Sequence, residues 1–498
     1  MSVLVVDVGT TGLRAAVVRD DGGIAALRHS PCPPVAPSPG LVEFDPAAMA
    51  RLALEACGAV LAEAGPVRAV GVTAQRASTV AWRRSTGEPL GPGIGWQDLR
   101  TVGECLSLRS SHGLVFAPNQ TGTKAAWLVR HGLGVAGGPS VPLDDVCLGT
   151  VDSWIVHALS GGDSHVTDPS HACVSGAYDV DAADWDARVL GLLGVPIACM
   201  PRVVASHGVV ATARALPGAP PIAAIVGDQQ ASLVGQGCVR AGDAKITFGT
   251  GGMLDVCTGT ERPAVLARSA HGTYPLVAYG PGAAGAARAA GSPSRTVWAR
   301  EAICISAGSN VEWLREDMGL VVTAEETDAL AATVSDAGGV TYVPALLGIG
   351  TPHWDYGARG TLLGLTRGAT RAHVVRAVLE GVAHRGADLL DAVRADTGLS
   401  PASLRIDGGM SRNDAFVQAL ADATGLPVEA SAVTEATTLG AAYLAGAAVG
   451  VWPSVEAAAQ TRRARRVVQP ARALDRSQWH EAVRRARGWI PALSALDF

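Results

Sequence analysis

Short apolar runs that end in glycine, threonine or aspartate recur along the chain and set its expected architecture. Residues 3–7 and 13–18 predict two strands around a Gly-Thr turn at residues 9–12. Residues 244–248 and 253–257 predict the same arrangement around a second Gly-Thr turn at residues 249–252. Because one copy opens each half of the chain, the repeat predicts two similar domains that face each other across a nucleotide.

Longer periodic segments predict helices between these strands. An aspartate and a proline precede an apolar pattern at residues 47–64, and Thr370 precedes an amphipathic pattern at residues 371–396. Residues 300–316 also predict a helix, with Ala307 and Gly308 inside it. A glycine there would let another helix or a flat ligand pack closely.

The strand predicted at residues 222–226 ends at Gly227, Asp228, Gln229 and Gln230. A carboxylate directly after a parallel strand points into the crevice where α/β sheets bind ligands, so Asp228 is a candidate general base. Glycines in the turn at 249–252 would let backbone N–H groups approach a phosphate, and Thr250 adds a hydroxyl donor. The alternative is an aspartate that caps a helix, followed by an ordinary glycine-rich hairpin. Neither Gly-Thr turn has the spacing of a P-loop or of a dinucleotide-binding fingerprint.

Three other segments carry candidate chemistry. Residues 92–100 form a polar-aromatic stretch around Trp96, which suits either a substrate loop or an edge loop with one packed tryptophan. Lys124, on a helix predicted at residues 123–131, could extend into the crevice or lie along the surface. His171 lies in a loop predicted at residues 168–172, and we interpret it as a hydrogen-bonded histidine without a metal partner.

Composition and charge narrow the possible partners. With 498 residues and a mass of 50.6 kDa, the chain should form two large domains. A net charge of −5 and a pI of about 6.2 argue against nucleic acid and anionic membranes as partners. We assign the basic cluster at residues 462–466 to a solvated helix face. The apolar window at residues 280–291 consists of small residues and predicts a loop rather than a membrane span.

The cysteines and the start of the chain predict a cytoplasmic protein. Nine cysteines without a Cys-x-x-Cys pair indicate reduced thiols rather than disulfides or a zinc site. The first residues enter a predicted core strand directly, which leaves no room for a signal peptide.

In their order along the chain, these motifs resemble the FGGY family of carbohydrate kinases, within the actin/Hsp70/hexokinase superfamily. The family's C-terminal signature is similar to residues 360–365, 373–374 and 377–380. Further motifs that resemble the family lie at residues 7–11, 227–230, 249–251 and 407–409. Among the members, the glycerol kinases resemble the chain most, at residues 75–76, 96–98, 148–154, 228–230 and 354–355.

The resemblance implies an α/β fold of two actin-like/ribonuclease-H-like (ASKHA) domains with a nucleotide cleft between them. Residues 1–243 would form the N-terminal FGGY domain, with the substrate site and the catalytic base. Residues 244–498 would form the C-terminal FGGY domain, which binds the nucleotide.

The implied activity is ATP-dependent phosphorylation of a hydroxyl group of a small polyol or sugar, with Asp228 as the general base. Asp7 would hold Mg²⁺ through water molecules. The positions that match the family's substrate-binding residues are Arg76, Trp96, Asp228 and Gln229. Those that match its ATP-binding residues are Thr10, Thr11, Arg14, Gly249, Thr250, Gly308, Gly409 and Asn413.

The chain departs from the glycerol kinases in the substrate pocket. Ala77 stands where they have a glutamate, Asn119 where they have a tyrosine, and Met253 where they have a phenylalanine. The pocket should therefore be larger and differently polar, and glycerol should be a poor substrate. The alternatives are a pentulose (xylulose/ribulose-type) or tetritol kinase, and, from another class, a catalytically silent sugar-binding regulator. Asp7, Asp228 and both Gly-Thr turns argue against the regulator.

Regulation and assembly should also differ. Several bacterial glycerol kinases bind fructose 1,6-bisphosphate on a loop with lysine and arginine, which corresponds here to residues 210–220. That segment has one arginine, no lysine and two prolines, so we expect no inhibition by the bisphosphate. A homodimer is the assembly that we consider for this chain.

Overall fold

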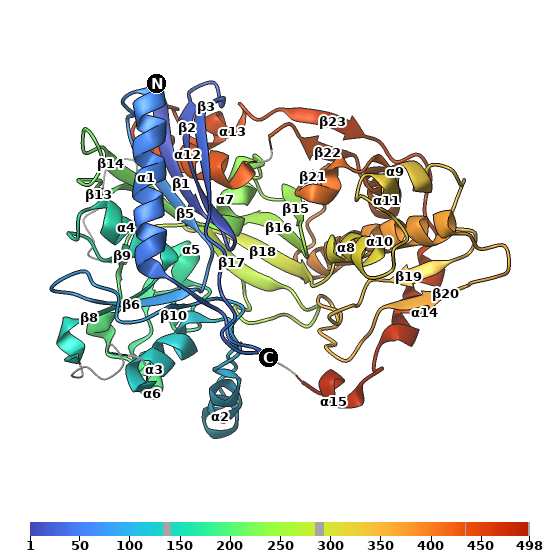
Figure 1. The fold of residues 1–498 in the computed structure, drawn as a ribbon, viewed down its shortest axis with the longest axis horizontal. Helices are drawn as coiled ribbons and strands as arrows, with labels where there is room; N and C mark the ends of the chain where they lie inside the picture. The colour runs from blue at the N-terminus through green and yellow to red at the C-terminus, as the bar shows by residue number, and fades with distance from the viewer. Residues whose placement is uncertain (132, 134–140, 284–292, 434, 497–498) are drawn as a thin grey trace.

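The computed structural model describes residues 1–131, 133, 141–283, 293–433 and 435–496, and Figure 1 shows its helices and strands. One sheet consists, in spatial order, of β13 (His207–Thr212), β14 (Pro221–Gly227), β5 (Val70–Ala74), β1 (Ser2–Val8), β2 (Gly12–Arg19) and β3 (Ile24–Pro31). The other consists of β17 (Tyr274–Tyr279), β18 (Val297–Cys304), β16 (Gly252–Gly259), β15 (Ala244–Phe248), β21 (Leu404–Asp407), β22 (Val428–Ser431) and β23 (Ala464–Val468).

The hairpin repeat predicted from the sequence is confirmed, because it occupies the same place in both sheets. β1 pairs antiparallel with β2 and parallel with β5. β15 pairs antiparallel with β16 and parallel with β21. In each sheet the Gly-Thr turn therefore lies at the same edge as the end of a parallel strand. This edge is where an α/β sheet binds ligands.

The helices are α1 (Pro46–Ala64), α2 (Val102–His112), α3 (Thr121–His131), α4 (Val151–Leu159), α5 (Pro169–Ala172), α6 (Ala187–Leu193), α7 (Asp228–Gly235), α8 (Ser309–Glu316), α9 (Glu326–Ala331), α10 (Arg371–Thr397), α11 (Asp414–Thr424), α12 (Ala436–Ala448), α13 (Val455–Ala459), α14 (Arg476–Ala486) and α15 (Pro491–Ser494). A smaller sheet has the order β4 (Glu43–Phe44), β7 (Gly93–Ile94), β6 (Thr79–Arg83) and β8 (Val146–Thr150). Short strand pairs are β10 (Tyr178–Asp179) with β11 (Asp184–Trp185), β12 (Arg202–Val203) with β9 (Val166–Thr167), and β19 (Thr341–Val343) with β20 (Thr361–Leu363).

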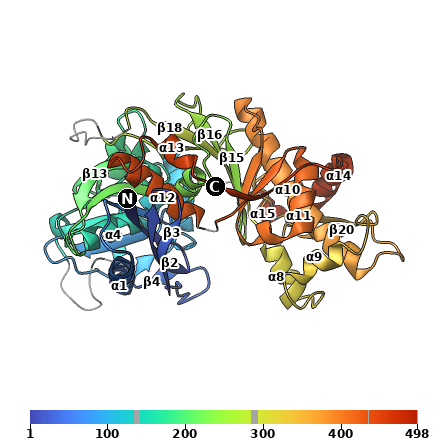
Figure 2. The same cartoon turned by 90° about the horizontal axis from the view of Figure 1, so that it is seen from above.

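α7 and α12 join the two halves of the chain. α12 packs on β1, β5 and β14 of the first sheet, although it comes from the C-terminal half; Figure 2 shows it in red beside the blue N-terminal strands. The two helices touch through bare backbone, since a Cβ on Gly440 would lie 1.8 Å from the Ala231 oxygen and one on Gly235 would lie 1.8 Å from the Ala436 oxygen. One apolar cluster accordingly contains Val3 and Val5 together with Tyr443.

Two helix predictions are wrong. Residues 300–316 are not one helix, because β18 runs to Cys304 and α8 begins at Ser309. β18 is a central strand that pairs with β16 and β17, and consecutive residues on both of its faces are buried. Its sequence therefore lacks the alternation of a half-exposed strand. The basic cluster at residues 462–466 leads into the edge strand β23 and forms no helix face.

Two other predictions concern the window at residues 280–291 and the possibility of a membrane span. The window at residues 280–291 lies mostly outside the described residues. None of the helices that the structure describes is long and apolar enough to cross a membrane.

Candidate active site

Asp228 and Arg76 extend from the ends of two paired strands. β14 and β5 are parallel neighbours with Gly227 opposite Ala74, so the residues that follow them enter the same crevice. Asp228 is the first residue of α7, and its Oδ1 accepts a hydrogen bond from the Gln229 backbone N–H at 2.8 Å. The Arg76 Nε lies 3.6 Å from the same oxygen, while the Asp228 side chain stays 27% exposed.

One nitrogen of Arg76 has no partner among the described residues. Its Nη2 donates to the Glu301 Oε2 at 2.7 Å, but its Nη1 is buried and forms no hydrogen bond there. A buried donor that is left unsatisfied costs about 1–3 kcal/mol. An oxygen of a bound ligand would remove this cost, and Arg76 is therefore suited to hold a hydroxyl group beside Asp228.

Buried charged residues on three neighbouring strands of the second sheet hold the side chain of Gln229. The strand registers place Lys245 opposite Asp255 and Asp255 opposite Glu301. The Lys245 Nζ lies 2.8 Å from the Asp255 Oδ2 and donates to the Gln229 Oε1 at 2.9 Å. Although burial lowers the pKa of Lys245, Asp255 raises it above its ordinary value, so the ammonium stays charged. This hydrogen bond fixes the orientation of the Gln229 amide, with its NH₂ group directed away from the ammonium.

Trp96 connects the expected substrate residues with the first Gly-Thr turn. Its indole Nε1 donates to the Thr10 Oγ1 at 3.1 Å, and its backbone N–H donates to the Ser78 Oγ at 2.9 Å. The structure therefore brings Trp96 and Thr10 together, as a site for phosphoryl transfer requires.

Asp7 lies near the end of β1, where the carboxylates around it outnumber the positive charges. Its side chain is buried, with the Arg14 Nη1 at 3.6 Å, and the Arg14 Nε lies 3.0 Å from the Glu435 Oε2. Burial is the main cause that raises the pKa of Asp7 to about 7; Arg14 opposes it, and Asp228 and Glu435 add to it. Asp7 and Glu435 flank the Arg14 guanidinium, and Asp228 lies near enough to Asp7 to raise its pKa, so these carboxylates offer the hard oxygen ligands that suit Mg²⁺.

The glycines of the nucleotide prediction lie where the chain must come close to itself or to a ligand. Gly308 donates to the Gly249 oxygen at 2.8 Å, and a Cβ on Gly308 would lie 2.5 Å from that oxygen. A Cβ on Gly249 or Gly409 would meet nothing within 4 Å, so open space lies above both residues. Gly249 and Gly409 follow the parallel strands β15 and β21 at one sheet edge. This arrangement suits a flat or anionic ligand.

The remaining predicted residues have structural contacts. The Asn413 Oδ1 accepts from the Phe416 N–H at 2.8 Å as the cap of α11, and its Nδ2 donates to the Thr327 Oγ1 at 2.9 Å. The backbone oxygen of Thr11 accepts from the Cys32 N–H at 3.0 Å. Thr250 holds the start of α8 through its own backbone oxygen.

Lys124 fits neither of the two expectations, because it lies inside the protein. It is 0% exposed, and its Nζ donates to the backbone oxygens of Asn119 at 2.7 Å and Ala77 at 3.4 Å. Burial lowers the pKa of Lys124 to about 7, against the opposing effect of Asp98. Ala77 itself adopts a left-handed φ of 66°.

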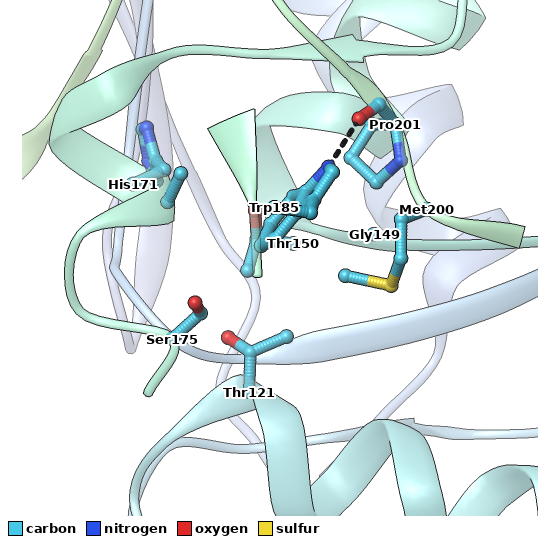
Figure 3. A pocket seen from close by; sticks show the side chains of 9 residues that line it. Thr121, Gly149, Thr150, His171, Ser175, Trp185, Met200 and Pro201 are labelled. Atoms are coloured by element: carbon cyan, nitrogen blue, oxygen red, sulfur yellow. Dashed lines mark hydrogen bonds between the residues drawn. The ribbon is translucent and has the colours of Figure 1, made fainter. Parts of the chain in front are cut away.

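The expectation that His171 has no metal-type partners is wrong. α5 and α4 bring it to Asp152 and Asp168, with one ligand atom from each of the three residues within 4.8 Å of the others. The spacing along the sequence gave no sign of this cluster, because Asp152 lies on a different helix. Figure 3 shows that His171 also borders a pocket with Thr121, Trp185 and Met200. The described lining of this pocket does not include Asp7, Arg76 or Asp228.

Several charged residues were missed by sequence reasoning. Lys245 and Asp255 could have been found, because they lie on the two facing strands of the predicted hairpin, although the actual register differs from the predicted one by one residue. Glu301 was hidden by the wrong helix prediction. Glu435 reaches Arg14 only through the packing of α12 on the first sheet, for which the sequence has no local signal.

Comparison with known proteins settles the family. Residues 2–235 match the N-terminal domain, and residues 244–449 the C-terminal domain, of the FGGY family of carbohydrate kinases. The chain belongs to this family. The earlier resemblance and the predicted fold class are thereby confirmed. As an FGGY carbohydrate kinase, it is an enzyme that uses ATP with Mg²⁺.

Similar proteins cover nearly the whole chain. It is 40% identical to a glycerol kinase of Trichlorobacter lovleyi, over 98% of this chain and 99% of that one. It is 41% identical to a glycerol kinase of Aromatoleum aromaticum over the same shares. Among solved structures, Plasmodium falciparum glycerol kinase with ADP has a TM-score of 0.87 at 25% identity and covers 97% of this chain and 98% of that one. A Brucella ovis protein named "xyloylose kinase" has a TM-score of 0.81 at 26% identity and covers 100% of both chains.

Proposed function

We propose that this FGGY kinase phosphorylates a hydroxyl group of a polyol or ketose with four or five carbon atoms, in preference to glycerol. The observation that carries the proposal is the buried Arg76 Nη1, which has no hydrogen-bond partner among the described residues and lies beside the partly exposed carboxylate of Asp228. Together with the NH₂ group of Gln229 and the ring of Trp96, it offers donors and a flat wall to a chain of hydroxyl groups. Glycerol kinases are similar in sequence, and the altered pocket residues argue for a different acceptor.

Three positions support a larger acceptor. Ala77, Asn119 and Met253 provide a smaller or less polar surface than the glutamate, tyrosine and phenylalanine expected from the glycerol kinases. The loss of one acceptor for a substrate hydroxyl costs about 1–3 kcal/mol. A pentulose or tetritol would fill the added space, and its further hydroxyl groups would bind the donors.

In the proposed reaction, Asp228 takes the proton of the attacking hydroxyl group. Arg76 holds the acceptor and keeps its oxygen near Asp228. ATP supplies the transferred phosphoryl group, and Mg²⁺ neutralises phosphate charge. Asp7 would hold Mg²⁺ through water molecules. The residues that would bind the phosphates, through charge or hydrogen-bond donors, are Thr10, Thr11, Arg14, Gly249 and Thr250. Those that would surround the adenosine are Gly308, Gly409 and Asn413.

Domain boundary, location and assembly are further parts of the proposal. We place the boundary between residues 243 and 244, because β14 is the last strand of the first sheet along the chain and β15 the first of the second. All nine cysteines are free, which supports a cytoplasmic enzyme. A homodimer remains our proposed assembly. Insensitivity to fructose 1,6-bisphosphate is supported by Arg214, the one arginine of residues 210–220, which is paired with Asp163.

The direct test is Asp228→Asn with a panel of polyols and ketoses. Turnover should fall by about a hundredfold or more because the general base is lost, while the melting temperature should hardly change. Asp163→Asn, an exposed aspartate away from the crevice, is the matched control and should keep wild-type turnover. Near-wild-type turnover of Asp228→Asn at saturating substrate would contradict the assigned base. A wild-type preference for glycerol would contradict the proposed acceptor.

A further inference from the structure

Two adjacent residues of α5 hold the ends of the strands that carry Arg76 and Asp228. The Ser170 Oγ accepts a hydrogen bond at 2.8 Å from the N–H of Gly227, the last residue of β14. The His171 Nε2 lies 3.3 Å from the oxygen of Ala74, the last residue of β5. Each contact therefore lies one or two residues before a side chain of the crevice.

Asp168 fixes this pair of residues in place. Its buried carboxylate accepts hydrogen bonds from the backbone N–H groups of Ser170 at 3.0 Å and His171 at 3.1 Å. It also accepts from the Ser170 Oγ at 2.8 Å, the Ser206 Oγ at 2.6 Å and the His171 Nδ1 at 2.9 Å. A buried carboxylate that accepts this many hydrogen bonds is held in one orientation.

The contacts of His171 require both of its ring nitrogens to carry protons. Nδ1 faces the carboxylates of Asp168 at 2.9 Å and Asp152 at 3.6 Å, and Nε2 faces the carbonyl oxygen of Ala74. A ring nitrogen that faces an acceptor must donate, so the ring is an imidazolium. Burial alone lowers the pKa of His171, but Asp152 and Asp168 raise it to about 9.

The other groups around His171 affect its charge less than Asp152 and Asp168 do. Asp228, beyond β14, adds a weaker attraction. The elements β11 and β17 also pack against α5, and their ionisable residues are Asp184, Tyr274 and Tyr279. On its remaining side lies the pocket of Figure 3, whose described lining includes Trp185, Met200 and Pro201 and no other charged side chain.

The same cluster reaches the second sheet. The Gly280 N–H donates to the Ser206 Oγ at 3.0 Å, and the Ser206 Oγ donates to Asp168. The Gln230 Nε2 bridges the Ser170 oxygen at 3.2 Å and the Val277 oxygen at 3.4 Å. The residues around Asp168 therefore connect β5 and β14 with β17.

We propose that Ser170 and the charged His171 are positioning residues, which set the distance between the Arg76 guanidinium and the Asp228 carboxylate. The inference rests on the proposed function, because it takes the roles of Arg76 and Asp228 from there. His171 acts through Ala74 on the acceptor-binding side, and Ser170 acts through Gly227 on the base. Neither residue touches the substrate.

Two amide substitutions separate the contacts of His171. The amide nitrogen of His171→Asn replaces Nδ1 and keeps the bond to Asp168, whereas that of His171→Gln replaces Nε2 and keeps the bond to Ala74. His171→Asn should lower kcat/KM by roughly tenfold to a hundredfold, mainly through a higher KM, because small displacements in an active site have effects of this size. His171→Gln should lose less. Ser170→Ala should mainly lower kcat, because its contact leads to Asp228.

The pH profile separates positioning from general loss of structure. Wild-type kcat/KM should decline near pH 9 as His171 loses its proton, and this decline should be absent in both amide variants. His165→Gln is the control: His165 is half-buried and bonded to a backbone oxygen, but loss of hydration lowers its pKa to about 4, so it is neutral throughout the tested range. This control should keep the wild-type decline.

Melting without substrate tests the charge independently of the proposed reaction. The pKa of His171 is raised from 6.5 in the unfolded chain to about 9, so its stabilising effect is complete below pH 6.5 and is lost between pH 6.5 and 9. The melting-temperature advantage of the wild type over His171→Gln should shrink across this range. If that advantage is seen but Asp228→Asn remains active, the charged His171 is supported and the assigned base is overturned.

Three results would overturn the inference. The first is a pair of amide variants with wild-type KM, kcat and alkaline decline. The second is a melting-temperature difference that does not depend on pH. The third is one metal ion per chain in the purified protein, detected by elemental analysis and lost in His171→Asn, because a metal ion would take the place of the Nδ1 proton.

Discussion

The two halves of the chain each bury one lysine beside the crevice, and the surroundings of the two differ. Only two of the 40 basic residues are lysines, and both Lys124 and Lys245 are 0% exposed. Lys245 has the carboxylate of Asp255 at 2.8 Å, and its pKa is raised. Lys124 has two backbone oxygens as its hydrogen-bond acceptors, and its pKa is lowered to about 7.

The two halves differ in whether a carboxylate lies beside the buried lysine. A buried ammonium keeps its charge only when a carboxylate balances the loss of hydration. The C-terminal half provides that balance and uses the lysine to orient Gln229. The N-terminal half lacks a carboxylate at position 77, near Lys124, where glycerol kinases are expected to have one. An arginine in place of Lys124 would remain charged without a nearby carboxylate, because its guanidinium does not lose its proton.

The largest effect should come from Lys245→Met. Removing the ammonium leaves Asp255 buried without its partner, and the free energy of unfolding should fall by about 3–5 kcal/mol in chemical denaturation. The double variant Lys245→Met/Asp255→Leu should recover most of this stability but not the KM for the acceptor, because the oxygen of Gln229 still lacks its donor. Equal stability of the two variants would contradict the role given to the ion pair.

Ala77→Glu should place a carboxylate near the buried lysine of the N-terminal half, as the C-terminal half already has near Lys245. The new carboxylate restores an acceptor for a substrate hydroxyl, so kcat/KM for glycerol should rise by roughly tenfold, which corresponds to about 1.4 kcal/mol. Ala77 already has a Cβ at its left-handed φ of 66°, so the longer side chain adds little backbone strain. Ala77→Gln has nearly the same shape without the charge and is the control. If both variants leave glycerol turnover unchanged, position 77 does not face the substrate.

Lys124→Met should change the stability of the protein in a way that depends on pH. The pKa of Lys124 falls from 10.5 to about 7 on folding, so burial of the charge destabilises the protein fully below pH 7 and not at all above pH 10.5. The variant should therefore melt above the wild type at pH 7, and the difference should disappear as the pH approaches 10.5. A difference that stays constant between these values would show that folding does not lower the pKa of Lys124.

The sequence predicted the elements that have a local cause. Both hairpins followed from their Gly-Thr turns, and Asp228 followed from its position after an apolar strand. The helix predicted over residues 300–316 failed because β18 is buried on both faces, where strand periodicity is lost. Glu435 and His171 could not be assigned, since their partners are brought to them by α12 and α4, and tertiary packing of this kind has no signature in the local sequence.

The contact between α7 and α12 has a consequence for the order in which the protein can fold. The face of the first sheet that contains Val3 and Val5 is covered by α12, which is made only after more than four-fifths of the chain has left the ribosome. Contacts between residues so far apart in sequence form slowly, and an uncovered apolar sheet is prone to aggregate. We therefore expect this face of the first sheet to be covered only late in synthesis, after α12 has been made.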